Sequence, residues 1–253
     1  HYEVDRKADP VFQRSTTDEF NQLNDAIEQL FDRSHRLFIQ QREFTENAAH
    51  ELQTPVAIFQ SKLELLMQTT PLNREQAELI NALDDTIRRL TNLNKSLLLL
   101  AKIENNQYSD LERIEVRNTC EKMIDQLDLL AQGKALTISK QFNSDIAVYA
   151  DPVLIDILIG NLLGNAVRHN QKNGEIAITT NGDQLTISNT GEGVRLISAK
   201  VFSRFHKNAR PGNREDGTGL GLAIVKNICA VYAYDVQYDY VSNRHVFSVR
   251  FNL

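Results

Sequence analysis

The first hydrophobic pattern along the chain is a repeat in which apolar positions alternate three and four residues apart. This spacing is typical of the seam of a helix in a coiled coil or a helical bundle. Two polar side chains, Ser34 and Gln41, interrupt the seam and weaken it locally. We therefore predict a long helix whose stripe packs on other helices. The stripe consists of Phe20, Leu23, Ile27, Leu30, Ser34, Leu37, Gln41, Phe44 and Ala48.

A second repeat of the same kind follows a short loop signal. Residues 69–73 contain Pro71, and Asn73 is suited to cap the next helix. Two long helices joined by a short loop form an antiparallel hairpin, and one hairpin cannot bury both of its stripes. No other helix of that length remains in the chain, so we expect two copies to pack as a dimeric four-helix bundle. The second stripe consists of Leu79, Leu83, Thr86, Leu90, Leu93, Leu97 and Leu100.

After Asn106 the pattern changes to short alternating segments mixed with helical ones. Alternation of apolar and polar residues predicts strands, and apolar spacing of three and four predicts helices. We therefore expect an α/β domain in which helices cover one face of a sheet. The predicted strands are residues 112–116, 135–142, 146–150, 175–180, 184–188, 234–240 and 246–251, and the predicted helices are 119–131, 151–170 and 219–231.

One histidine in the first helix lies beside groups that suit nucleophilic chemistry. Glu51 directly follows His50, and Thr54 lies one helical turn further on the same face. Imidazole is nucleophilic through a neutral ring nitrogen, and an adjacent carboxylate can orient the ring and accept its proton. The heptad phase leaves His50 just off the seam, facing water, and Pro55 should bend the helix beside it. Taken alone, the motif is also compatible with an ordinary exposed His-Glu pair.

The helix at residues 151–170 places two amides one turn apart. Asn161 and Asn165 share one stripe, and Arg168 and His169 follow a turn later. Amide oxygens can coordinate Mg²⁺ when phosphates supply further ligands, and Arg168 could pair with a phosphate. Two asparagines making surface hydrogen bonds are the alternative for this spacing alone.

Two glycine clusters follow that helix. Asn189 begins the first, N-T-G-E-G, where Gly191 and Gly193 let a ligand approach the backbone and the Asn189 amide can hydrogen-bond a flat base. The second cluster opens a helix, whose exposed N–H groups and dipole suit a polyphosphate. Neither matches a P-loop or the dinucleotide fingerprint, and each alone is more often a turn. The second cluster consists of Gly217, Thr218, Gly219, Leu220, Gly221 and Leu222.

Composition limits the class of protein. The chain has 253 residues, 42% hydrophobic and 24% charged. Its net charge of -5 gives no overall indication of nucleic-acid binding. Cys120 and Cys229 form no disulfide or zinc pattern, which favours a reducing compartment. No apolar run approaches the roughly 18 residues of a membrane span. The chain begins without methionine or a signal peptide, so we expect a fragment of a longer protein.

The order of these motifs is more specific than any one of them. The His50-Glu51-x-x-Thr54-Pro55 motif, the asparagine pair, N-x-G-x-G, F-S-R-F at 202–205 and G-T-G-L-G-L at 217–222 together resemble the transmitter region of sensor histidine kinases over residues 35–253. The resemblance implies a dimerisation and histidine phosphotransfer hairpin at 34–106 and a GHKL-type (Bergerat) α/β sandwich that binds ATP at 107–253. Residues 1–33 would be a linker helix, and 10–33 weakly resemble the end of a HAMP linker. It also implies the cytoplasmic portion of a bacterial inner-membrane protein, anchored through segments absent from this chain.

The resemblance assigns roles by position. His50 matches the phosphorylated histidine, Glu51 its base and Thr54 the residue that assists dephosphorylation of the partner. Asn161 and Asn165 match the Mg²⁺ ligands. Phe202 and Phe205 match the aromatic segment before an ATP lid, which would run through Lys207, Pro211 and Gly212 to about residue 216. The implied nucleotide-binding residues are Asn161, Asn165, Arg168, His169, Asn189, Gly191, Gly193, Phe205, Lys207, Gly217, Thr218, Gly219, Leu220, Gly221 and Leu222.

The chain departs from the family pattern at two positions. Asn189 stands where the family has an adenine-binding aspartate, and Gln53 stands where a basic residue is common. A neutral hydrogen bond is about half as strong as a charge-assisted one, so we expect weaker ATP binding rather than none.

The resemblance implies a homodimeric kinase that autophosphorylates His50 from ATP-Mg²⁺. It would pass the phosphoryl group to an aspartate of a response regulator receiver domain, with phosphatase activity as well. The alternatives are a GHKL-type ATPase, which leaves the His50 motif unexplained, and a kinase-dead scaffold or phosphatase.

Overall fold

The computed structural model describes residues 17–69, 71–105, 107–108, 110–191, 195–198, 200–206 and 218–252. At helical positions 38, 41, 42, 45, 46, 49, 50 and 69 it describes the backbone alone. The chain divides into two compact units, residues 1–87 and 88–253.

The first unit contains the first predicted long helix and the beginning of the second. Helix α1 spans Asp18–Thr69, and helix α2 spans Arg74–Glu104, with its first turns in this unit. Asn73 caps α2 as predicted, because its Oδ1 accepts from the Gln76 N–H at 2.8 Å. Gln76 Oε1 accepts in return from the Asn73 N–H at 3.1 Å, which completes a capping box. Helix α1 continues through Pro55, and the bend at this residue stays a prediction.

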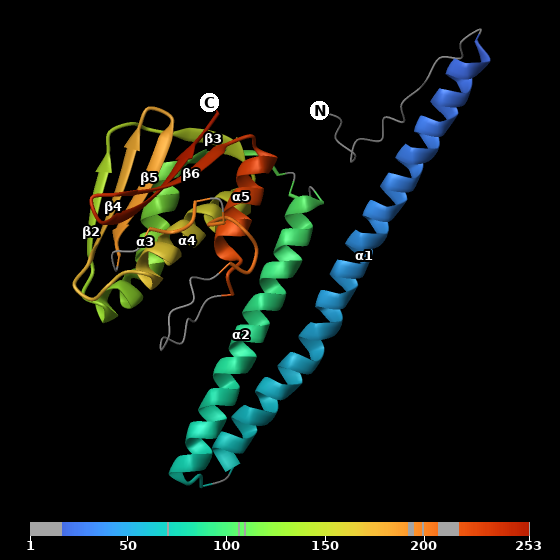
Figure 1. Ribbon diagram of the computed structural model, residues 1–253. Helices are drawn as coiled ribbons and strands as arrows, with labels where there is room; N and C mark the ends of the chain where they lie inside the picture. Colours follow the sequence, from blue (N-terminus) through green and yellow to red (C-terminus); the bar gives the residue numbers. More distant parts are fainter. Residues whose placement is uncertain are drawn as a thin grey trace. The chain divides into compact units, whose positions relative to one another are not determined.

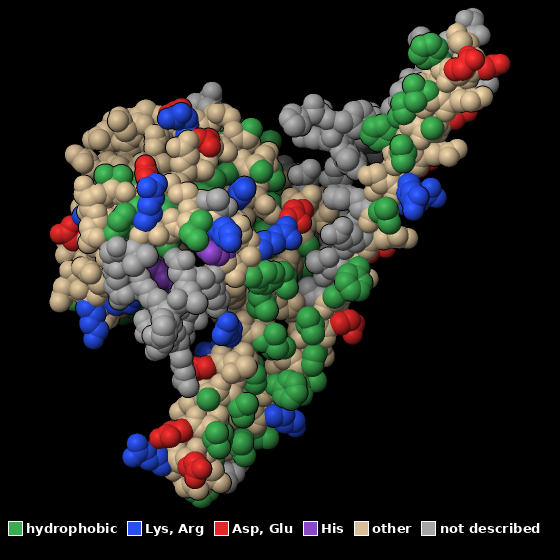
Figure 2. Space-filling view, in the orientation of Figure 1, with side chains coloured by type: hydrophobic (Ala, Val, Ile, Leu, Met, Phe, Trp, Pro, Cys, Tyr) green, Lys and Arg blue, Asp and Glu red, His purple; other side chains and the backbone are tan. Residues whose placement is uncertain are grey.

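Large apolar side chains of the first unit remain exposed along both helices. Val56 and Ile80 are buried, yet Phe20, Phe44, Leu79 and Leu83 are between 53% and 75% exposed. Figure 2 shows apolar side chains gathered along the helices on the face in view. Exposed apolar side chains gathered in this way are typical of an interaction surface.

The second unit is built on a five-stranded sheet. Its strand order is β2-β4-β5-β7-β6, in which β2 and β4 are parallel and the other neighbours antiparallel. A separate antiparallel pair is formed by β1 and β3. The predicted strands and helices are confirmed, with ends shifted by a few residues. The elements are β1 Glu112–Glu115, α3 Val116–Gly133, β2 Thr137–Phe142, β3 Ala147–Ala150, α4 Pro152–Arg168, β4 Glu175–Asn181, β5 Gln184–Thr190, α5 Gly221–Val231, β6 Asp235–Val241 and β7 Arg244–Arg250.

Helices α3, α4 and α5 cover one face of this sheet, which makes a two-layer α/β sandwich (Figure 1). Alternate residues of β4, β5 and β7 are buried, as expected when one face of a sheet is covered. Helix α4 lies at the centre of the helical layer, in contact with α3, α5 and β5. It begins at a cap in which Asp151 Oδ1 accepts from the Val153 N–H at 2.9 Å, with Pro152 in the first turn.

The last turns of α2 belong to the second unit. Leu100 and Ile103 are buried in its hydrophobic core. Glu104 accepts from Nδ2 of Asn227 on α5 at 2.8 Å and forms an ion pair with Arg204. The compact units therefore divide within α2, at residue 87, rather than at the end of the helix.

Both cysteines are buried in the second unit and unpaired. Burial raises the pKa of each thiol to about 12, so both are protonated and unreactive at neutral pH. Across the described residues, His, Cys, Asp and Glu side chains nowhere gather in threes to hold a metal ion. None of the described helices is both long enough and apolar enough to span a bilayer.

The exposed stripes predict that the chain self-associates. Sedimentation at tens of micromolar should find a dimer, because a second copy can bury both seams. Leu83→Glu should weaken the dimer by placing a charge in the seam. Asn81→Glu, at an exposed position off the seam, is the matched control and should leave it intact. A native chain that sediments as a monomer would contradict the bundle.

Candidate functional site

The asparagine pair of α4 meets the second glycine cluster. Nδ2 of Asn161 donates to the Ile157 carbonyl at 2.8 Å, which fixes the amide and leaves its Oδ1 facing α5. A Cβ added to Gly221 would lie 2.7 Å from this Oδ1, so a side chain there would displace the asparagine. Asn165 lies one turn further along α4 and is partly buried. The fold therefore joins two motifs that are sixty residues apart in the sequence.

The aromatic segment packs against the same glycine cluster. Phe205 and Gly219 both have positive φ angles, and the Phe205 N–H donates to the Gly219 carbonyl at 2.9 Å. A Cβ on Gly219 would lie 3.1 Å from the Phe205 backbone. Phe202 makes an edge contact with the Phe247 ring, with centroids 6.4 Å apart, and Arg204 pairs with Glu104. These contacts anchor the segment directly before position 207.

In the second glycine cluster, the leucine side chains pack into the core and leave the backbone for a ligand. Leu220 is fully buried in the core, so only its backbone is available to a ligand. Its N–H points to Thr218 Oγ1 at 3.4 Å, and α5 begins at the next residue. Leu222 also packs against the core. A ligand here would meet backbone N–H groups at a helix N-terminus, as the sequence predicted.

The Asn189 side chain is buried at the end of β5, with 1% of its surface exposed. Its Nδ2 donates to the Thr190 carbonyl at 2.9 Å. Its Oδ1 has no hydrogen-bond partner among the described residues. A buried acceptor without a donor costs free energy, about 1–3 kcal/mol, unless a ligand supplies the hydrogen bond. The position therefore favours a ligand that carries an N–H donor.

A histidine that the motifs do not include lies beside Asn189. His245 on β7 pairs with Asn189 across the sheet, and its ring covers Gly191 so closely that a Cβ there would collide with it. Nδ1 of His245 lies 2.9 Å from the Tyr238 hydroxyl, which accepts from the Leu196 N–H at 3.0 Å. Gly191 is thus required by a close approach of the His245 ring.

A lysine that sequence reasoning missed caps the C-terminus of α4. Nζ of Lys134 donates to the carbonyls of Val167, Arg168 and Asn170 at 3.2, 2.6 and 3.3 Å. A cation is favourable there because the helix dipole is negative at this end. Burial and the neighbouring Arg168 charge lower the pKa of Lys134. Arg168 and His169 themselves are exposed, at the end of the helix.

Several predicted site residues lie outside the described part. They are Gly193, Lys207, Gly217 and the side chain of His50. The His50 backbone is helical, and the side chains of Glu51 and Thr54 in the first unit are exposed. In the second unit the structure brings together Asn161 with Gly221 and Phe205 with Gly219, and it places His245 against both Asn189 and Gly191.

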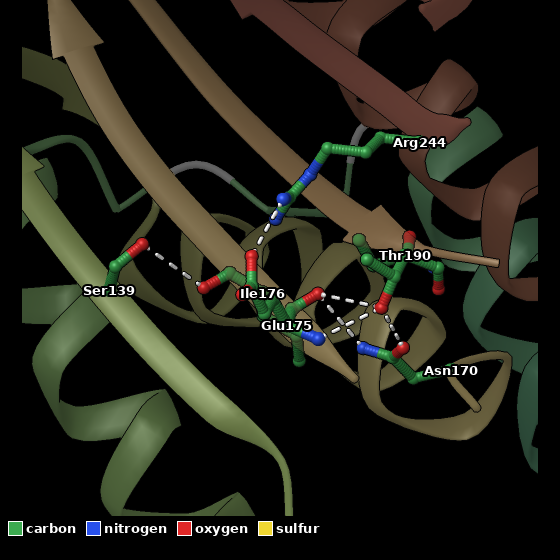
Figure 3. Close-up of polar contacts among 7 residues, drawn as sticks. Ser139, Asn170, Glu175, Ile176, Thr190 and Arg244 are labelled. Carbon is green, nitrogen blue, oxygen red and sulfur yellow. Dashed lines mark hydrogen bonds and ion pairs between the residues drawn. The ribbon is translucent and has the colours of Figure 1, made fainter. Parts of the chain in front are cut away.

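Sequence reasoning also missed Asn170 and Thr190, which flank the predicted motifs. The Thr190 hydroxyl donates to Asn170 Oδ1 at 2.6 Å, and this bond joins the end of β5 to the turn after α4 (Figure 3). Asn173 and Gly174 are typical turn residues, because such residues adopt unusual backbone angles. Their sequence therefore indicates a turn, but it does not indicate which side chain the turn contacts.

Together these groups can bind an elongated polar ligand with a flat base. The buried acceptor of Asn189 suits the amino group of a base, and the start of α5 suits phosphate oxygens. The Asn161 and Asn165 amides suit a hard cation that the phosphates also ligate. The residues present therefore fit a nucleotide with Mg²⁺.

Two family models match the chain. The His Kinase A (phospho-acceptor) domain matches residues 40–106. The histidine kinase-, DNA gyrase B-, and HSP90-like ATPase matches residues 150–253. Sensor protein QseC of Salmonella typhi is 30% identical over 234 residues, which are 90% of this chain and 51% of that protein. The chain spans about half the length of the curated relatives it matches.

Solved structures share the fold. Full-length ShkA in complex with AMPPNP aligns with a TM-score of 0.65 at 23% identity, covering 83% of this chain and 46% of that one. Histidine kinase AdeS of Acinetobacter baumannii aligns with a TM-score of 0.55 at 21% identity, covering 80% and 97%. The fold is thus a helical phospho-acceptor region followed by a GHKL-type α/β domain.

The Lys134 cap gives a stability prediction. Lys134→Met keeps most of the aliphatic stem but removes the ammonium, so it should lower the free energy of unfolding by about 1–2 kcal/mol. Urea denaturation followed by circular dichroism measures this loss. Lys140→Met, at an exposed position on β2, is the control and should change stability by less than about 0.5 kcal/mol. Equal stabilities of the two variants would contradict the capping role.

Proposed function

The chain belongs to the sensor histidine kinases, and we propose that it phosphorylates His50 from ATP and passes the phosphoryl group to an aspartate of a response regulator. The observation that carries the proposal is the buried, unpartnered Oδ1 of Asn189 at the end of β5. It lies in a domain whose second glycine cluster meets Asn161, in a chain that also carries the phospho-acceptor motif.

In this proposal the nucleotide spans the second unit from β5 to α5. Asn189 Oδ1 accepts from the exocyclic amino group of adenine, and the N–H groups at the start of α5 bind the phosphates. Asn161 and Asn165 would hold Mg²⁺ through neutral amide oxygens. When bound, the ion supplies charge neutralisation of the phosphates. Arg168, His169 and Lys207 approach the nucleotide, and Phe205 precedes the lid.

The phosphoryl transfer is mostly a matter of positioning and charge stabilisation. The neutral ring nitrogen of His50 attacks the γ-phosphorus, the bond to the β-phosphate oxygen breaks, and ADP leaves. Glu51 orients the ring and accepts the proton from its other nitrogen. Thr54, one turn further, positions the water that later removes the phosphoryl group from the regulator.

The proposed assembly follows from the same family. A homodimer would bury the stripes of α1 and α2, and the receiver domain of the regulator would dock at the exposed surface around Thr54. Membrane anchoring would come through segments outside this chain, with these residues in the cytoplasm. Asn189, in place of the aspartate of the family, lowers ATP affinity. Gln53, in place of a basic residue, changes the surroundings of the acceptor histidine.

Labelling tests the function directly. The native chain incubated with γ-labelled ATP and Mg²⁺ should acquire label that is labile in acid and stable in base, as a phosphoramidate is. His50→Gln should remove the label, because glutamine lacks a nucleophilic ring nitrogen. Glu51→Gln should slow labelling on the order of 10²–10⁴-fold, the usual worth of a positioned base.

Thr54→Ala is the matched variant one turn away. It should label normally, since its hydroxyl takes no part in the attack on ATP, but it should dephosphorylate a phosphorylated regulator more slowly. Label that persists in His50→Gln would refute the assignment. ATP hydrolysis without any label would favour the GHKL-type ATPase, and binding without either would favour the scaffold.

Asn189 gives a separate prediction for the base. Asn189→Ala should weaken binding of a non-hydrolysable ATP analogue by about 0.5–1.5 kcal/mol, the net worth of a neutral hydrogen bond. Titration calorimetry measures the change. Asn181→Ala, at the exposed end of β4, is the control and should bind like the native chain. Unchanged affinity in Asn189→Ala would remove this residue from the site.

A further inference from the structure

The Asn189 carboxamide can present either an acceptor or a donor to a base, depending on how it is turned. In the structure its Nδ2 donates to the Thr190 carbonyl at 2.9 Å, and its Oδ1 is the buried atom without a partner among the described residues. The Thr190 carbonyl oxygen can only accept a hydrogen bond. It therefore excludes the flipped Asn189 amide, in which Oδ1 would face that carbonyl. The orientation of Asn189 therefore depends on where the Thr190 peptide group is held.

The Thr190 peptide is held on one side by its pairing with Arg244 on β7, and on the β4 side by its own side chain. The β4–β5 ladder ends at the pair Ile176 and Asn189, one residue before Thr190. Beyond it, Thr190 Oγ1 accepts from the Glu175 N–H at 2.8 Å and donates to Asn170 Oδ1 at 2.6 Å. The hydroxyl thus continues the pairing with β4 where the backbone ladder between β4 and β5 has stopped. In Figure 3 the Asn170 carboxamide and the Thr190 hydroxyl point toward each other beside the Glu175 backbone.

Asn170 is fixed in turn by backbone groups. It is buried, its Oδ1 also accepts from the Gln171 N–H at 3.0 Å, and its Nδ2 donates to the Glu175 carbonyl at 3.1 Å. Gly174 leaves room for this pair, because a Cβ there would lie 2.5 Å from Thr190 Oγ1 and 2.9 Å from the Gln171 carbonyl. The start of β4 is further tied to β7 by the ion pair of Glu175 with Arg244, 2.9 Å long.

We propose that Asn170 and Thr190 are positioning residues that lock the Asn189 carboxamide with its oxygen toward the base, so that the site selects 6-amino purines over 6-oxo purines. The inference rests on the proposed nucleotide site. A 6-oxo purine would set its own oxygen against Oδ1, an acceptor against an acceptor, while Nδ2 is turned toward the Thr190 carbonyl. A carboxylate at position 189 presents acceptors in either orientation and would need no such lock.

Calorimetric titration with ADP and IDP tests the proposal, since neither nucleotide carries a γ-phosphoryl group to transfer. The native 253-residue chain should bind ADP at least about tenfold more tightly than IDP. Thr190→Val keeps the shape but loses the hydroxyl, and it should reduce this preference to about threefold or less. Thr190→Ser restores the hydroxyl and should restore the preference.

Matched variants separate positioning from simple destabilisation. Thr186→Val lies on the same strand and removes a hydroxyl that bonds Ser248 on β7 at 3.2 Å, so it should leave the ADP preference unchanged. Gly174→Ala should push Asn170 and Thr190 apart and lower the preference, whereas Gly133→Ala, with open space around its Cβ, should not. In an Asn189→Asp background the preference should no longer depend on position 190.

The outcomes are distinguishable. A native chain that binds ADP and IDP equally well overturns the specificity proposal while leaving the nucleotide site in place. A preference that survives in both Thr190→Val and Gly174→Ala overturns the positioning role. If, in the Asn189→Asp background, Thr190→Val lowers the preference for ADP over IDP as much as it does in the native chain, the hydroxyl has only a structural role. This result also overturns the positioning role. A native chain that binds neither nucleotide overturns the proposed function together with this inference.

Discussion

The packing of helix α4 against the sheet is the interaction on which the second unit depends. Eight of its side chains are buried, and they place α4 between α3, α5 and β5. A helix held so firmly fixes the direction of every side chain on its remaining face. Asn161 therefore meets Gly221 on α5, and the turn that follows α4 meets the end of β5. The polar caps Asp151 and Lys134 complete the two ends, where the helix has backbone groups without partners.

Polar groups buried at the edge of this core are satisfied almost entirely by one another. Asn170, Thr190 and the Glu175 backbone exchange hydrogen bonds in a closed set, and His245 with Tyr238 does the same on the neighbouring strands. A closed set of this kind holds a backbone more rigidly than separate surface bonds do. Against this background the Asn189 oxygen belongs, with Arg244 Nε and His206 Nε2, to the buried atoms of the described residues that lack a hydrogen-bond partner, and such exceptions gather at binding sites.

The elements of the fold could be predicted because their signals are local. Period-two alternation located β4, β5 and β7, and the Asn73 cap marked the start of α2. The site could be predicted only motif by motif. The spacing of Asn161 and Asn165 is visible in the sequence, but their neighbour Gly221 is brought close by the sheet order. Asn170 and Lys134 could not be recognised, because their partners are backbone carbonyls, N–H groups and a hydroxyl from other elements, which leave no pattern along the chain.

The asparagine at position 189 exchanges one physical difficulty for another. An aspartate at 1% exposure would place a charge in the core, and without a bound base this charge would lack a partner, which is more costly than an unpartnered amide. The amide avoids that cost, and in return its hydrogen bond to a base is weaker and its two ends must be distinguished. A carboxylate recognises an amino group in any rotation, whereas a carboxamide recognises it in only one. The Thr190 carbonyl makes the distinction, and its own position is supported by the pairing of Thr190 with β7, by a hydroxyl and by a glycine that no side chain could replace.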